Sequence, residues 1–169
     1  MLVIVMGVSG SGKSYLAERL AQATGWPFAE GDDYHSEANK AKMAARIPLT
    51  DADRAPWLAA LHARLLTWHQ QHQPGILTCS ALRTAYRETL AAGIPELRFV
   101  WLDPSRAILE ERVAHRPGHY MPAALLDSQL ATLEPPTASE HVLRLDGTEP
   151  IDQAIATILA WLDMQHPAS

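Results

Sequence analysis

A glycine-rich octapeptide, GVSGSGKS, occupies residues 7–14 and leaves few folds open to the chain. It matches the spacing GxxxxGK[ST], follows an apolar run at 2–6, and precedes apolar residues at helical spacing over 13–23. Glycines in such a strand–loop–helix unit let backbone N–H groups close around a polyphosphate at the helix N-terminus. The lysine places a positive charge at the β- and γ-phosphates, and the hydroxyl after it binds Mg²⁺. The predicted nucleotide-binding residues are Gly7, Val8, Ser9, Gly10, Ser11, Gly12, Lys13 and Ser14, with Ser14 as the metal ligand.

Outside this loop, short apolar runs alternate with longer segments whose apolar residues recur at helical spacing, the pattern of an α/β fold. With no repeat or linker, the 169 residues predict a single domain spanning 1–169. Continuously apolar strands are typical of a buried parallel sheet, so we expect three α/β/α layers around a five-stranded, mostly parallel sheet. The expected strands are 2–6, 28–30, 76–79, 97–102 and 142–145. Helices are expected over 13–23 and 105–115, and from near residues 53 and 148.

Two segments break this alternation. Residues 32–53 are rich in charge, and residues 116–140 contain a glycine and four prolines with little strand signal. In α/β enzymes such insertions lie over the carboxyl ends of the strands. We therefore expect a substrate flap at 32–53 and a lid at 116–140.

The composition of the chain limits which kinds of partner and compartment are expected. Fourteen Lys and Arg against 19 Asp and Glu give a net charge of −5 without a basic cluster, so no nucleic-acid partner is expected. The apolar run at 2–6 is far shorter than the roughly 20 residues that span a membrane, and no membrane association is expected. The single cysteine, Cys79, has no intrachain disulfide partner and favours a reducing compartment, here the cytoplasm.

The octapeptide alone does not separate a kinase from a GTPase or an ATP-driven motor. The chain contains neither an NKxD guanine-reading tetrapeptide nor a DxxG switch, and it is too short for the usual accessory machinery of a motor. The strand at 76–79 leads into Ser80 instead of the aspartate that usually supports Mg²⁺, which leaves Glu30 or Asp32 for that task. This combination favours a small-molecule kinase with ATP as co-substrate.

From residue 30 the chain reads EGDDYHSEANKAKMAARIPLTDADRAPWL, which resembles the signature EGDxxHPxxNxxKMxxGxPLxDxDRxPWL of the gluconokinases, single-domain P-loop carbohydrate kinases. CSALRTAYRETL at 79–90 and RPGHYMPAALLDSQLATLEPP at 116–136 are similar to two further stretches of that family. The resemblance covers residues 3 to about 136 in order and register. It implies the P-loop kinase fold, ATP-dependent phosphorylation of D-gluconate on its 6-hydroxyl, and a homodimer.

Four positions depart from the family pattern: Ser36 stands for proline, Arg46 for glycine, Arg83 for the common lysine and Tyr120 for phenylalanine. A glycine in place of Arg46 would mark a turn with positive φ, which disfavours other residues. An arginine there alters the flap or contacts the substrate carboxylate, so the range of sugar acids stays open.

The chemistry of the site can also be argued from the residues. Phosphorylating a hydroxyl requires a proton acceptor and neutralisation of the transferred charge. Asp32, directly after the second strand, is the expected base, with Asp33 as its rival and an ordinary turn as the alternative role. Arg112 and Arg116 are four residues apart, so they share a helix face and could close onto the triphosphate; a solvated face is the alternative. The predicted catalytic residues are Lys13, Asp32, Arg112 and Arg116, and the predicted substrate-binding residues are Asp32, His35, Arg54, Arg83, Arg87 and His119.

Several alternatives stay open at this point. Each arginine could instead belong to a surface ion pair, and Asp51 and Asp53 could simply cap the following helix. Adenine contacts are expected near residues 146–148 and the lid helix, as in related kinases. Another small-molecule kinase such as a shikimate kinase, or a nucleotide-binding module without turnover, would be the alternative functions.

Overall fold

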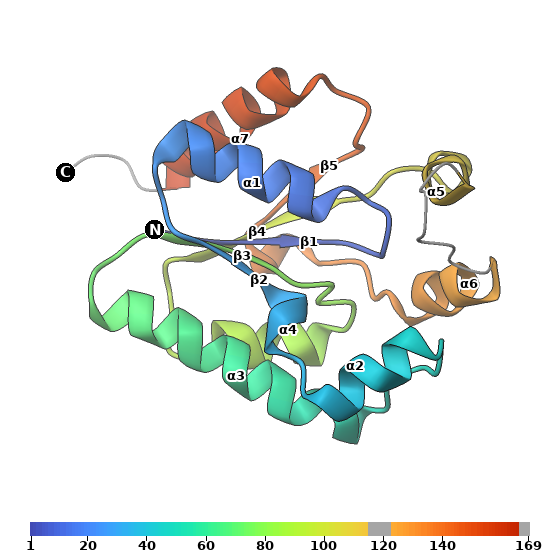
Figure 1. Cartoon of the computed structure of the whole chain (residues 1–169). Helices are drawn as coiled ribbons and strands as arrows, with labels where there is room; N and C mark the ends of the chain where they lie inside the picture. Colours follow the sequence, from blue (N-terminus) through green and yellow to red (C-terminus); the bar gives the residue numbers. More distant parts are fainter. Residues whose placement is uncertain (115–122, 166–169) are drawn as a thin grey trace.

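The computed structural model describes residues 1–114 and 123–165 and shows a sheet between two layers of helices (Figure 1). Its five strands are ordered β2-β3-β1-β4-β5, and all four pairings are parallel, which confirms the predicted α/β/α architecture. The strands are β1 (Leu2–Met6), β2 (Phe28–Glu30), β3 (Gly75–Thr78), β4 (Leu97–Leu102) and β5 (Val142–Leu145).

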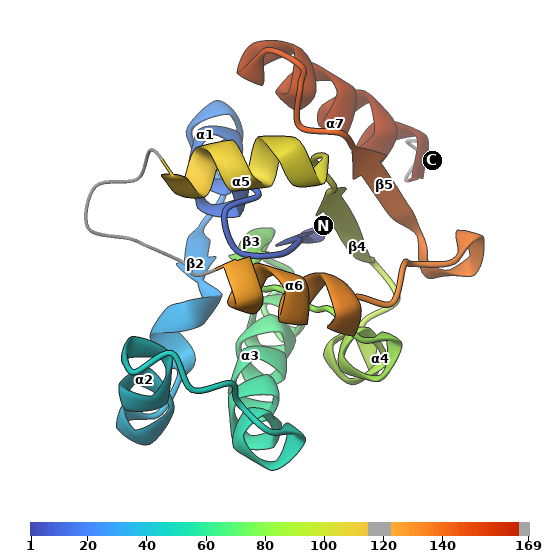
Figure 2. The ribbon, with the colours of Figure 1, turned by 90° about the vertical axis from the view of Figure 1, so that its right-hand side faces the viewer.

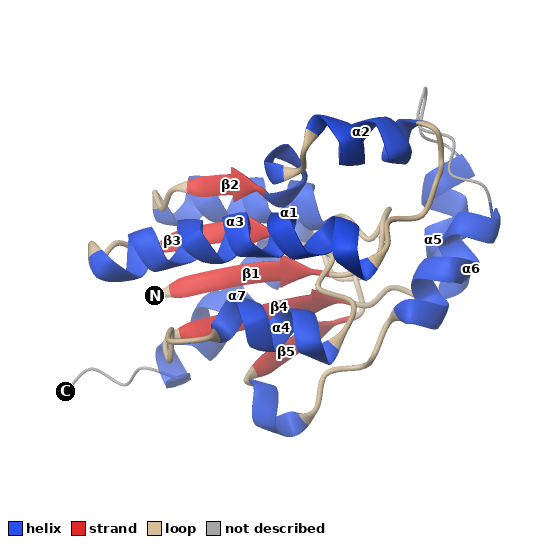
Figure 3. Ribbon diagram, turned by 90° about the horizontal axis from the view of Figure 1, so that it is seen from below, coloured by secondary structure: helices blue, strands red, loops and turns tan. Residues whose placement is uncertain are grey.

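Helices α1 and α7 cover one face of the sheet and α3 and α4 the other, while α2, α5 and α6 lie beyond the carboxyl ends of the strands (Figures 1 and 3). The α-helices are α1 (Lys13–Thr24), α2 (Glu37–Ala44), α3 (Asp51–Gln70), α4 (Thr84–Ala91), α5 (Arg106–Ala114), α6 (Ala123–Thr132) and α7 (Ile151–Gln165). Two short 3₁₀ helices, η1 (Gly31–Tyr34) and η2 (Ala138–Glu140), complete the described elements. None of the helices in this described part is both long enough and apolar enough to cross a membrane.

Strand β1 is the centre of the core. All five of its side chains are fully buried, and they alternate between the two helical layers as the pleat requires. Leu2, Ile4 and Met6 pack in the cluster that contains α3 and α4, whereas Val3 and Val5 pack with α1 and α7. The uninterrupted aliphatic sequence of this strand thus follows from its burial on both faces.

The flap and the lid both contain helices that the sequence did not predict. Ser36 caps α2 by accepting the backbone N–H of Asn39 at 3.1 Å, and this helix occupies the middle of the flap. Helix α3 begins two residues earlier than expected because Thr50 and Asp53 form a capping box. Of the two aspartates considered as caps, Asp53 therefore has that role. Helix α6 occupies the middle of the predicted lid (Figure 2).

Gly75 offers a test of the packing between α3 and the sheet. A Cβ atom on Gly75 would lie 2.3 Å from Cε3 of the buried Trp68 ring, well inside van der Waals contact. We expect Gly75→Ala to lower the free energy of unfolding by about 1–3 kcal/mol, the usual cost of overpacking, in urea denaturation. In a Trp68→Leu background the same substitution should cost much less. Equal costs in both backgrounds would contradict the packing explanation.

Candidate functional site

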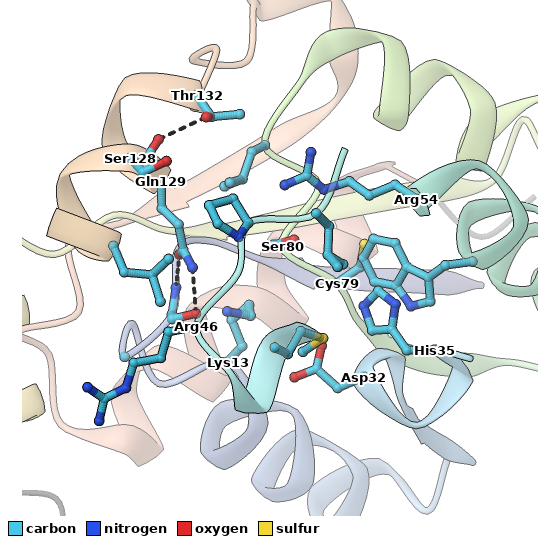
Figure 4. A pocket seen from close by; sticks show the side chains of 18 of the residues that line it. Lys13, Asp32, His35, Arg46, Arg54, Cys79, Ser80, Ser128, Gln129 and Thr132 are labelled. Atoms are coloured by element: carbon cyan, nitrogen blue, oxygen red, sulfur yellow. Dashed lines mark hydrogen bonds between the residues drawn. The ribbon is translucent and has the colours of Figure 1, made fainter. Parts of the chain in front are cut away.

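The carboxyl ends of the strands open into a cavity of about 650 Å³ (Figure 4). Its wall is built from the glycine-rich loop, the segment after β2, the flap, the start of α3, the end of β3, and α6. The site-forming segments predicted from the sequence therefore meet in one place. Of the predicted site residues, the wall includes Ser9, Gly10, Lys13, Asp32, His35 and Arg54.

The glycine-rich loop has the geometry that its sequence predicts. Gly10 and Gly12 have φ angles of 81° and 96°, in the region that favours glycine. A Cβ on Gly7 would lie 2.6 Å from the carbonyl oxygen of Leu102, so no larger residue fits there without displacing backbone. Lys13 opens α1 and its Nζ donates to the Val8 carbonyl at 3.0 Å, which brings the ammonium group back over the loop.

Glu30 joins the end of β2 to this loop. Ser14 Oγ donates to one carboxylate oxygen of Glu30 at 2.8 Å, and Thr78 Oγ1 donates to the other at 2.6 Å. Of the two residues expected to support a magnesium ion, Glu30 is thus the one hydrogen-bonded to the predicted metal ligand. Hydroxyl and carboxylate oxygens are the hard ligands that Mg²⁺ prefers, so the residues present fit that ion.

The sequence left Asp32 and Asp33 as rival bases, and the geometry separates them. Both lie on η1, but Asp32 lines the cavity and Asp33 is not among its lining residues. Gly31 allows the end of β2 to lie close against β3, because a Cβ at residue 31 would lie 1.9 Å from the carbonyl oxygen of Thr78. Its N–H donates to Thr78 Oγ1 at 3.0 Å, so β2 ends tightly against β3.

His35 is buried in the cavity wall against Trp57. The two rings stack with centroids 4.2 Å apart and an interplanar angle of 13°, and Trp57 Nε1 donates to the Gly31 carbonyl at 2.8 Å. Burial lowers the pKa of His35, Asp32 opposes that effect, and the Arg54 charge adds to it. The sequence assigned Trp57 to the core, which is correct, but the same ring also forms the floor under His35.

Arg54 and Arg83 were expected to bind a substrate carboxylate together, but only one of the two lines the cavity. Arg54 lines the cavity, and its Nη1 donates to Tyr86 Oη at 3.1 Å. Arg83 is outside the cavity wall and half-exposed, 3.7 Å from a carboxylate oxygen of Asp51. Asp51 also accepts a hydrogen bond from Tyr86, which lowers the pKa of this carboxyl group. Of the expected arginine pair, Arg54 is thus the member that lines the cavity.

Arg87 was predicted to bind the substrate, and the structure contradicts this prediction. Its side chain is 1% exposed, and its Nε donates to Glu140 at 2.7 Å. Its two other nitrogens donate to the carbonyl oxygens of Ala81, at 2.8 Å, and Glu134, at 2.9 Å. The guanidinium is consumed by these contacts, and it fastens the segment after α6 to the start of α4. The contacts with Glu134 and Glu140 span 47 and 53 residues of sequence, and local patterns do not reveal such contacts.

Arg46 has φ 62°, the left-handed conformation expected for the position where the family pattern has glycine. It lines the cavity with its flap neighbours Ile47 and Pro48. Its side chain extends away from Asp32 and His35 (Figure 4). Arginine at position 46 therefore adopts the turn conformation that the glycine of the family pattern predicts.

Arg112 lies between the glycine-rich loop and the loop after β5. Its Nη1 donates to the Ser11 carbonyl at 2.8 Å and its Nη2 to the Gly147 carbonyl at 3.0 Å. Both loops border a second cavity of about 600 Å³, which Tyr15 and Leu102 also line. This is the region where the sequence predicted adenine contacts. Two other predicted residues, Arg116 and His119, lie outside the described residues.

Gln129 of α6 is a residue that the sequence reasoning missed. Its Oε1 accepts the backbone N–H of Ser9 at 2.7 Å, and its Nε2 donates to Ser9 Oγ at 3.0 Å (Figure 4). The signal that could have found it is the spacing of Ser128, Gln129 and Thr132, which share one helix face and line the cavity. The lid helix is thus hydrogen-bonded to the phosphate-binding loop.

Cys79 also lines the cavity but is 3% exposed. Burial raises the pKa of its thiol to about 12, so it is protonated and a weak nucleophile at neutral pH. Its side chain is a buried part of the cavity wall.

Similarity to known proteins identifies the family. A family model described as an AAA domain matches residues 2–136 of this chain. A gluconokinase of Gluconobacter oxydans (strain 621H) is 46% identical over 157 residues, 93% of this chain and 88% of that protein. The chain belongs to the gluconokinase family. The thermosensitive gluconokinase of Escherichia coli (strain K12) is 41% identical over 144 residues, 85% of this chain and 77% of that one.

Solved structures agree with this family. A gluconokinase from Sinorhizobium meliloti 1021 superposes with a TM-score of 0.87 at 44% identity, covering 96% of this chain and 91% of that chain. A shikimate kinase from Aquifex aeolicus has a TM-score of 0.60 at 18% identity, over the whole of both chains, and shares the fold alone. The P-loop kinase fold expected from the sequence is confirmed.

Arg87 and Arg83 form a matched pair for testing whether Arg87 stabilises the fold or binds the substrate. We expect Arg87→Met to lower the free energy of unfolding by about 3 kcal/mol or more in chemical denaturation, because it breaks a buried ion pair. Arg83→Met, one turn earlier at the N-cap of the same helix but half-exposed, should cost at most about 1 kcal/mol. An Arg87→Met protein of unchanged stability with a raised KM for the acceptor would restore the original prediction.

Proposed function

We propose that the protein transfers the γ-phosphoryl group of ATP to the 6-hydroxyl of D-gluconate, giving 6-phospho-D-gluconate and ADP. The observation that carries the proposal is that Lys13, Asp32 and Arg54 line one cavity in a chain of the gluconokinase family. A phosphate-binding cation, a proton acceptor and a cation for a carboxylate thereby face the same space. The choice of the 6-hydroxyl follows from the resemblance of residues 30–58 to that family.

The roles follow from position and charge. Asp32 accepts or orients the hydroxyl proton, since it is the aspartate on the cavity wall. Lys13 neutralises charge on the transferred group, and Arg54 binds the carboxylate of the sugar acid. Arg112, which already contacts the Ser11 carbonyl, stabilises charge at the triphosphate.

Mg²⁺ is proposed as the accompanying ion, held by Ser14 with Glu30 beside it. When bound, it neutralises charge on the β- and γ-phosphate oxygens. Among the described residues no group of three or more His, Cys, Asp or Glu side chains is placed to hold a metal. The phosphates of the nucleotide would therefore supply much of the coordination, as is usual for this ion.

The second cavity is proposed to hold the adenine ring, because it adjoins the loop at Ser11 and Gly12 and includes Gly147. A cytoplasmic location is proposed from the single cysteine, and a homodimer from the family resemblance. The partners proposed are ATP and a sugar acid, with neither nucleic acid nor membrane.

The proposed function is tested by measuring ADP release in a coupled assay over gluconate, other sugar acids, shikimate and nucleoside monophosphates. We expect ATP- and Mg²⁺-dependent turnover with gluconate and the product 6-phosphogluconate by mass spectrometry. Turnover confined to shikimate or to a nucleoside monophosphate would refute the proposal, and nucleotide binding without turnover on any acceptor would indicate a binding module.

Two variants test the division of roles. Asp32→Asn should lower kcat by about 10²–10⁴-fold, the usual contribution of a positioned base, while ATP binding by calorimetry is retained. Lys13→Ala should lose both turnover and much of the ATP affinity. Asp33→Asn is the matched control and should leave kcat within about threefold of the parent, since it removes a neighbouring charge without touching the wall. A larger loss in Asp33→Asn than in Asp32→Asn would reverse the assignment.

A further inference from the structure

One atom of Asn39 lies between a ring nitrogen of His35 and a backbone carbonyl oxygen. Nδ2 of Asn39 lies 2.8 Å from the backbone carbonyl oxygen of Asp53 and 3.3 Å from Nδ1 of His35. A carbonyl oxygen only accepts hydrogen bonds, so the Asn39 atom that faces it is the amide nitrogen. That nitrogen carries two hydrogens and only donates, so it also donates to Nδ1. With this donation, Nδ1 of a neutral ring carries no proton, and the proton is on Nε2.

Packing holds both partners in this arrangement. Asn39 is 5% exposed, and its backbone N–H is bound by the Ser36 cap of α2. His35 is 7% exposed and is clamped by the stacked Trp57 ring. Neither side chain can turn without losing a hydrogen bond or a ring contact in a buried place, and an unpaired buried polar group is costly.

The proton position decides what His35 can do in the cavity. Because Nδ1 is engaged by Asn39, Nε2–H is the group that the ring can offer to a ligand. In this tautomer Nε2 donates and cannot accept a proton. His35 is thereby a hydrogen-bond donor, and the task of accepting the hydroxyl proton is left to Asp32, which lies on the same wall (Figure 4).

We propose that Asn39 is a positioning residue that keeps the proton of His35 on Nε2, so that His35 donates a hydrogen bond to an oxygen of the sugar acid bound beside Asp32. The nature of the acceptor rests on the proposed function, whereas the tautomer follows from contacts within the protein alone. The two parts can therefore fail separately.

The tautomer is tested by long-range ¹H–¹⁵N correlation NMR on the full chain labelled at histidine, near neutral pH. The signals of His35 are assigned by their loss in His35→Gln. We expect the parent protein to show Nδ1 without a proton and Nε2 with one. Asn39→Asp replaces the donor by an acceptor and should bring a proton to Nδ1. A parent spectrum with Nδ1 protonated would overturn the proposal.

Steady-state kinetics with gluconate test the consequence. Asn39→Ala and Asn39→Asp should raise the KM for gluconate about tenfold, the equivalent of one hydrogen bond, with the KM for ATP unchanged. Ser36→Ala is the matched control, because it removes the cap of α2 beside Asn39 but keeps the donation to His35. It should change the KM for gluconate by at most about twofold and leave the His35 spectrum unaltered.

Equal effects of Ser36→Ala and Asn39→Ala on both the spectrum and the KM would show that Asn39 only supports the fold of α2, and would overturn the proposal. A parent protein without gluconate turnover would refute the proposed function and the sugar-acid contact with it. The NMR spectrum would still decide whether Asn39 sets the tautomer.

Discussion

Strand β1 is hydrogen-bonded along both edges and buried on both faces, and the functional groups are placed relative to its carboxyl end. It pairs with β3 on one side and β4 on the other, which fixes the register of all three strands. The backbone N–H of Cys79 continues this pairing to Val5 at 3.1 Å, and that of Gly7 reaches the Ser80 carbonyl at 3.3 Å. The phosphate-binding loop and the wall of the cavity that Asp32 lines therefore leave the sheet side by side.

The acceptor side depends on this arrangement through close backbone contacts. Gly31 brings the end of β2 against Thr78, and the Gly31 carbonyl in turn holds Trp57. Trp57 supports His35, and Asn39 orients it. A chain of short contacts thus runs from the sheet to the flap, and the precision of the site derives from the sheet instead of from the flap itself.

The sequence predicted the features that local chemistry determines. Continuous apolar runs and the spacing of glycines sufficed for the strands and the phosphate-binding loop, and the structure places Lys13 and Asp32 in one cavity as expected. Features set by distant contacts were missed. An arginine such as Arg87 is suited to binding a substrate carboxylate, but its carboxylate partner in the structure is Glu140, which lies 53 residues away in the sequence. Gln129 meets Ser9 across 120 residues; the spacing of polar residues on its helix could have marked it as a cavity residue, but could not have shown that Ser9 is its partner.

The contact between Gln129 and Ser9 has a thermodynamic consequence for the lid. A backbone N–H has a single hydrogen and donates a good hydrogen bond to one acceptor at a time. In the phosphate-binding loop, the N–H of Ser9 donates to the amide oxygen of Gln129. Any anion that takes this N–H has to displace the lid helix from it. Anion binding at Ser9 and docking of α6 are then coupled by a single free energy that acts equally in both directions. The more strongly α6 binds the empty loop through this contact, the more weakly, by the same free energy, the loop binds a phosphate at Ser9.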